Sequence, residues 1–91
     1  MPPAQNRISG LILLSTVDKP GVEESLLAVL APFSLSIMEM QRIALRGRLI
    51  IGILISFDPA HARAIAKDIN EFGSTSGIDI ALDFSEANDE K

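Results

Sequence analysis

The sequence predicts an α+β fold in which a four-stranded antiparallel sheet carries two helices on one face. The chain has 91 residues, of which 47% are hydrophobic and 22% charged, a composition typical of one small domain with its own core. Apolar segments of strand length and two segments of helical periodicity follow in the order strand, helix, strand, strand, helix, strand. Right-handed crossovers turn that order into the βαββαβ, or ferredoxin-like, arrangement.

The first third of the chain supplies one strand and one helix. Residues 1–7 are polar and contain two prolines, which predicts a flexible leader, and Ile8–Thr16 is an apolar run of strand length. From Val22 onward, apolar residues recur at the spacing of one helix face. Pro32 cannot continue that helix, so we expect it to end near Ala31.

The middle of the chain predicts a β-hairpin. Ser36–Arg46 and Arg48–Ser56 are both of strand length, and the second is almost continuously apolar. Gly47 stands between two arginines and can supply the positive φ that a tight turn needs.

The last third predicts a helix and a final strand. Asp58 can cap the helix and Pro59 fits its first turn, while the small residues 73–77 read as a loop. Ile78–Phe84 alternates strictly between apolar and other residues, as a strand with one buried face does. The domain is therefore expected to span 8–84, followed by a charged tail or linker, 85–91.

The distribution of charge predicts which strands lie in the middle of the sheet. The first and third strands are continuously apolar, whereas Glu39, Arg42, Asp79 and Asp83 lie on the second and fourth, as edge protection requires. Two helices cover only one face, yet the central strands are apolar at both odd and even positions. The uncovered apolar patch favours pairing with a second copy or another domain over a free monomer; the alternative is that long neighbouring side chains cover it.

Composition excludes several classes of function. The chain has twelve acidic residues, eight basic residues and a single His, which gives a net charge of −4. Such an acidic chain lacks the basic surface that nucleic-acid binding needs. With no Cys and one His, neither a cysteine-ligated nor a two-His metal site is possible, and we expect no cofactor. No apolar run approaches the ~18 residues of a membrane span and no signal peptide opens the chain, so a cytoplasmic location without membrane contact is expected. No catalytic motif is present.

The segment from Asp18 to Val22, between the first strand and the first helix, is the candidate site. The first N–H groups of a helix carry its positive end and can bind a carboxylate. Gly21 would let a ligand approach this backbone closely, and Asp18 could cap the helix or bind the ammonium group of an amino acid. The alternative is that Asp-Lys-Pro-Gly is simply a good turn and helix start.

These residues resemble the ACT domain, a small regulatory module that binds amino acids and controls metabolic enzymes. Asp18-Lys19-Pro20-Gly21-Val22 matches the family's signature, and the likeness runs from Ile8 to Phe84. The hairpin from Arg46 to Ser56 is similar to the N-terminal ACT region of actinobacterial-type phosphoserine phosphatases. The resemblance implies an allosteric domain of serine biosynthesis, L-serine as ligand and pairing with another ACT domain. It implies these ligand-binding residues: Asp18, Lys19, Pro20, Gly21, Val22, Met38 and Glu39.

The chain also departs from the family pattern. Residues 32–35 replace the glycine-containing turn that members often have after the first helix, and Glu39 stands where many have Asn or Asp. The D-x-D-x-[TV] nucleophile motif of the phosphatases is absent, so this chain would be only the regulatory part of such an enzyme. The alternatives are a stand-alone amino-acid sensor or subunit-assembly module, and an acylphosphatase-type enzyme. The last is disfavoured because the loop holds no Arg and the strands no Asn.

Overall fold

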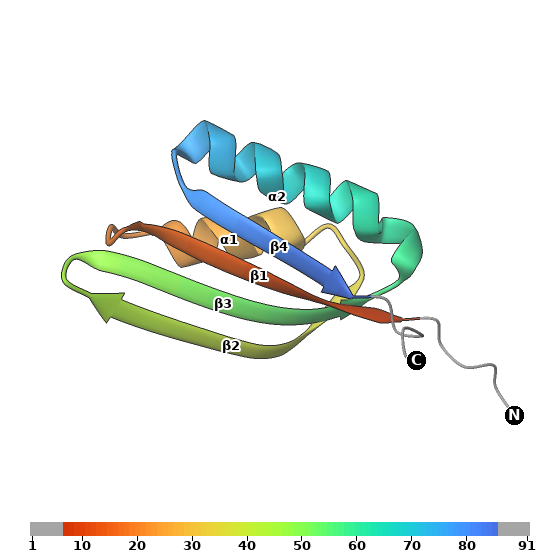
Figure 1. Ribbon diagram of the computed structural model, residues 1–91. Helices are drawn as coiled ribbons and strands as arrows, with labels where there is room; N and C mark the ends of the chain where they lie inside the picture. The colour runs from red at the N-terminus through yellow and green to blue at the C-terminus, as the bar shows by residue number, and fades with distance from the viewer. Residues whose placement is uncertain (1–6, 86–91) are drawn as a thin grey trace, which may run out of the picture.

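The computed structural model describes residues 7–85 and confirms the predicted order of elements and the ferredoxin-like fold (Figure 1). The expected leader and charged tail lie outside the described residues, except for Arg7 and Ser85. The elements are β1 (Ile8–Val17), α1 (Val22–Leu30), β2 (Leu35–Leu45), β3 (Arg48–Phe57), a 3₁₀ turn η1 (Pro59–His61), α2 (Ala62–Ser76) and β4 (Asp79–Ser85).

The strands form one antiparallel sheet in the order β2-β3-β1-β4. The two apolar strands are therefore central and the two charged strands lie at the edges, as the charge distribution predicts. Both helices pack against the same face of the sheet (Figure 1). The opposite face, which we call the open face, carries no helix among the described residues.

The core lies between the sheet and the helices. Side chains alternate along a strand, so even positions of β1 and odd positions of β3 face the helices while their neighbours face the open side. The fully buried residues include Ile53 and Ile55 of β3, Leu26 of α1, and Ile65 of α2. The complete buried apolar set is Ile12, Leu14, Val22, Leu26, Leu30, Leu49, Ile51, Ile53, Ile55, Phe57, Ile65, Ile69 and Ile78.

The hairpin between β2 and β3 closes with a two-residue turn. Leu45 pairs with Arg48, and both residues between them have positive φ, 51° at Arg46 and 76° at Gly47. Two consecutive left-handed residues are the geometry of a type I′ turn, whose twist matches that of the flanking strands. The expectation for Gly47 is confirmed, and Arg46 shares its conformation.

The predicted loop at 73–77 is wrong, because α2 continues through it to Ser76 and ends at Gly77, whose φ is 68°. Gly73 is buried against β4: a Cβ there would lie 3.0 Å from the carbonyl oxygen of Ile78 and from a methyl group of Ile80. Glycine at this position lets α2 approach β4 closely. The free energy gained by this packing outweighs the low helix propensity of glycine. At the other end, the Asp58 carboxylate accepts a hydrogen bond of 2.9 Å from the Ala60 N–H, which confirms Asp58 as a cap.

Two glycines on the central strands differ in what surrounds them, which yields a test of the core. A Cβ on Gly10 would overlap the ring of Phe84 and lie 3.0 Å from the ring of Phe57. A Cβ on Gly52 would meet only a methyl group of Leu13, at an ordinary 3.4 Å. Gly10→Ala should lower the free energy of unfolding by about 1–3 kcal/mol through overpacking. Gly52→Ala should change it little or raise it by up to about 1 kcal/mol, because alanine suits a strand interior better. Urea unfolding of both variants measures the contrast, and equal effects would show that the Phe57–Phe84 contact does not constrain Gly10.

Candidate functional site

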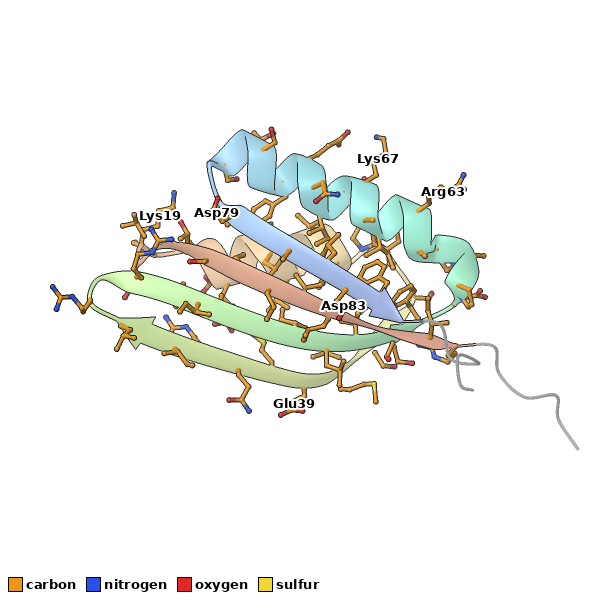
Figure 2. The ribbon with its side chains drawn as sticks, viewed as in Figure 1. Lys19, Glu39, Arg63, Lys67, Asp79 and Asp83 are labelled. Carbon is orange, nitrogen blue, oxygen red and sulfur yellow. The ribbon has the colours of Figure 1, made fainter. Side chains whose placement is uncertain are left out.

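A hollow of about 450 Å³ lies at the connection between β1 and α1. The loop residues 18–21 and the first turn of α1 form one side of it, and Arg42 of β2 and Leu49 of β3 close the other. Lys19 stands at this end of the molecule (Figure 2). The structure thus brings together five of the predicted ligand-binding residues, Asp18 to Val22.

Gly21 gives this hollow its main chemical feature. Its φ of 86° is left-handed, and it is the N-cap residue immediately before α1. The first hydrogen bond inside the helix runs from the Ser25 N–H to the Gly21 carbonyl, at 3.0 Å, so the amides of Val22, Glu23 and Glu24 have no partner within the helix. These N–H groups carry the positive end of the helix and suit a carboxylate.

Of the two roles that the sequence offers Asp18, the structure does not show the first, a cap of α1. Within the described part of the chain, no side chain makes a capping hydrogen bond at the start of α1. Instead the Asp18 backbone N–H donates to the Gly47 carbonyl at 2.8 Å, which ties the loop to the hairpin turn. Asp18 is exposed, so its carboxylate is accessible to a positively charged group of a ligand.

Arg42 borders the hollow and was not among the predicted site residues. Its Nε lies 3.3 Å from a carboxylate oxygen of Glu23, so the ion pair joins edge strand β2 to the first turn of α1. Both side chains are partly exposed, and such a pair contributes little stability. The sequence did carry a signal, because Arg42 lies two residues after Met40 and therefore shares the face of β2 that packs on the core.

Met38 and Glu39 lie elsewhere in the same chain. Glu39 pairs with Leu54 on β3, six residues from Arg48 at the hairpin end, a separation of roughly 20 Å along the strand. Met38 stands at a β-bulge on the edge strand, where its side chain is 59% exposed. One chain therefore supplies the loop side of the predicted site and leaves these two residues on a free sheet edge.

The remaining described residues are expected to hold no metal site, and His61 is expected to lie at the surface near a cap. Among residues 7–85, no three His, Cys, Asp or Glu side chains gather as metal ligands would. His61 packs edge-on against Phe33 with ring centroids 6.4 Å apart, next to the capped turn that the sequence indicates. No helix within 7–85 has the length and apolar character to cross a membrane. In the hollow itself, the amides that follow Gly21 and the Asp18 carboxylate offer partners for the two charges of a zwitterion.

The sequence of this chain matches a known protein family and part of a known enzyme. The family model of the ACT domain matches residues 11–83. The phosphoserine phosphatase SerB2 of Mycobacterium tuberculosis is 32% identical over 82 residues, which make up 88% of this chain and 20% of that enzyme. This chain thus corresponds to about a fifth of that relative.

Solved structures share the fold at low sequence identity. An ACT domain protein from Streptococcus pneumoniae superposes with a TM-score of 0.77 and 16% identity, covering 92% of this chain and 97% of that one. The regulatory subunit of aspartate kinase from Thermus thermophilus gives a TM-score of 0.65 and 13% identity, covering 84% of this chain and 50% of that one. From the family match, the identity to the phosphatase and the fold, we conclude that this chain belongs to the ACT domain family of regulatory modules.

Proposed function

We propose that this chain is an amino-acid-binding regulatory domain of a larger phosphoserine phosphatase of L-serine biosynthesis, with L-serine as its ligand. The observation that carries the proposal is the glycine-started helix facing an exposed aspartate, in a domain 32% identical to part of a phosphoserine phosphatase. The catalytic domain would lie in another part of the parent protein, which we place in the cytoplasm.

The proposed contacts follow from the chemistry of the hollow. The serine carboxylate would accept hydrogen bonds from the backbone amides near Gly21 and Val22, where the helix dipole favours negative charge. The serine ammonium group would lie against the Asp18 carboxylate. Lys19 and Pro20 shape the loop between these two groups, and Pro20 fixes φ just before the left-handed glycine.

The other side of the site would come from a paired ACT domain. The hollow is open to solvent at the end of the sheet, and Met38 and Glu39 stand on an exposed edge strand that another sheet edge can meet. An ACT domain placed against β2 would bring its own residues corresponding to Met38 and Glu39 toward the loop. Pairing and ligand binding would then favour each other, because the paired domain would complete the ligand site and the bound ligand would contact both domains.

Regulation requires that serine bind two states of the parent enzyme with different affinities. A ligand shifts a conformational equilibrium only by that difference in binding free energy. Serine is the product of phosphoserine hydrolysis, so a serine-binding domain would report product concentration to the catalytic domain.

A second candidate is a stand-alone ACT protein that senses an amino acid or assembles subunits. The Streptococcus pneumoniae ACT domain protein favours it, because the matched fold makes up 97% of that chain. Such a protein would use the same hollow and the same edge strand without a catalytic domain attached.

The first prediction tests the hollow with Gly21→Val. Wild type at a hundredfold excess of serine over its dissociation constant should gain about 2.7 kcal/mol, a rise in melting temperature of about 10–20 °C. The valine side chain should remove this rise, because it occupies the approach to the amides and disfavours the φ of 86°. The variant should lose only about 1–2 kcal/mol of stability and stay folded.

Gly77→Val is the matched control. Gly77 also has positive φ, 68°, with no atom within 4 Å of a Cβ built on it, and it does not line the hollow. Gly77→Val should lower the melting temperature by about as much as Gly21→Val does, yet keep the serine-dependent rise in melting temperature. An equal rise in wild type and Gly21→Val would place the site elsewhere, and no rise with any amino acid in wild type would contradict binding by the isolated domain.

The second prediction concerns catalysis. The purified chain should release no phosphate from phosphoserine in the presence of magnesium, because the sequence has no D-x-D-x-[TV] nucleophile motif. A phosphate-release assay checks this, with an intact phosphoserine phosphatase as the positive control. Magnesium-dependent turnover by the chain would show that it is more than a regulatory domain.

A further inference from the structure

Two side chains of opposite charge meet in the wall of the hollow at Gly21. Arg42 comes from β2 and Glu23 from the first turn of α1, and the Arg42 Nε lies 3.3 Å from a carboxylate oxygen of Glu23. Both residues line the hollow. The backbone N–H of Glu23 is also one of the three amides that α1 leaves without a partner in the helix. The ion pair therefore stands beside the amides to which the serine carboxylate is proposed to bind.

The strand register explains why Arg42 reaches this place. Arg42 is paired with Ile51, whose side chain is fully buried beneath the helices, so Arg42 projects from the same face of the sheet. Because β2 is an edge strand, a long side chain on this face can extend past the core to the start of α1. The Arg42 side chain is still 53% exposed and that of Glu23 36%, so a ligand in the hollow can contact both.

The pair has hydrogen-bonding capacity to spare. A guanidinium carries five N–H donors, and a carboxylate has two acceptor oxygens. Within residues 7–85, neither the Arg42 nor the Glu23 side chain makes a hydrogen bond to a further protein group. The donors of the one and the acceptors of the other are therefore available, side by side, to a ligand group that needs both.

The charges around the hollow disfavour a ligand with a negative side chain. Three carboxylates line it, those of Asp18, Glu23 and Glu24, against the two basic side chains of Lys19 and Arg42, which leaves one net negative charge. The positive charge of Arg42 is already balanced by Glu23. A zwitterion with an uncharged side chain meets no net repulsion here, whereas a phosphate group beside this pair would be repelled by the Glu23 carboxylate.

We propose that Arg42 and Glu23 together recognise the hydroxyl group of serine and reject the phosphate group of phosphoserine. The Arg42 guanidinium donates a hydrogen bond to the hydroxyl oxygen, and the hydroxyl donates its hydrogen to a carboxylate oxygen of Glu23. A hydroxyl group is a donor and an acceptor at once, so it satisfies both members of the pair. The methyl group of alanine satisfies neither, and a fully ionised phosphate has no hydrogen to donate to Glu23.

This role rests on the proposed function, from which it takes the positions of the serine carboxylate and ammonium group. It adds a third point of attachment, at the side chain of the ligand. Serine and phosphoserine are the product and the substrate of the proposed parent enzyme and differ at this group alone. The pair therefore makes the domain respond to the product in the presence of the substrate.

The first experiment is isothermal titration calorimetry of the full chain with L-serine, L-alanine and O-phospho-L-serine. Wild type should bind serine about tenfold more tightly than either of the others, because hydrogen bonds to charged groups are lost with the hydroxyl. Arg42→Met should bind serine and alanine with equal affinity. Arg48→Met is the control, since Arg48 donates to the Ser15 hydroxyl and does not line the hollow, and it should keep the tenfold preference.

The second experiment compares two neighbouring carboxylates and remains decisive if Arg42→Met does not fold. Glu23 and Glu24 both lie in the first turn of α1 and line the hollow, but of the two only Glu23 is paired with Arg42 within the described part of the chain. Glu23→Ala should lose the preference for serine over alanine and bind phosphoserine at least tenfold more tightly than wild type does, because the freed Arg42 can bind the phosphate. Glu24→Ala should keep the preference for serine and gain less than about threefold for phosphoserine, since an exposed charge at a distance is screened.

The outcomes separate this role from the proposed function. Wild type that binds serine no more tightly than alanine, or equal effects of Glu23→Ala and Glu24→Ala, would overturn the role of the pair and leave serine binding in place. A wild type that binds none of the three compounds would overturn both. Melting without ligand checks that each variant is folded, and the changes should be small because both side chains of the pair are partly exposed.

Discussion

The burial of one face of β1 and β3 beneath the two helices is the constraint on which the rest of the structure depends. Ile12 and Leu14 from β1 and Ile51 and Ile53 from β3 are almost fully buried there. Because the side-chain period of a strand is two, a slip of one residue would turn this whole set to the open face. The register is therefore fixed, and with it the position at which β1 ends and α1 begins.

Fixing the register also fixes what the opposite face presents. Leu13 and Ile50 are in the same strands as the core residues but have the opposite parity, so no helix among the described residues covers them. Exposure of these apolar side chains to water is unfavourable, because burial of apolar surface is what stabilises a fold. The two faces of the sheet thus differ: one is buried beneath the helices and holds the domain together, and the other exposes apolar side chains.

The candidate ligand site depends on the same frame but stands at the end of the sheet. The hydrogen bond from Asp18 to Gly47 holds the loop against the hairpin turn, and the pair of Arg42 and Glu23 holds the edge strand against α1. Between these two links lie the helix amides that follow Gly21. The frame thus positions the amides and the Asp18 carboxylate, and the core residues Val22 and Leu49 also line the hollow.

Local patterns in the sequence determined the four strands, the start of α1, the capped turn at Asp58, the hairpin turn at Gly47 and the central place of the two apolar strands. Each of these follows from alternation, proline, glycine or charge within a few residues. The tertiary structure alone decided three features: that α2 runs past Gly73, that Asp18 bonds the hairpin instead of capping α1, and that Arg42 reaches Glu23. The physical reason is the same for all three. Each depends on a contact between elements that are distant in the chain or meet only after packing, and neither propensity nor spacing records how closely a helix will approach a strand or which side chains will meet across the gap.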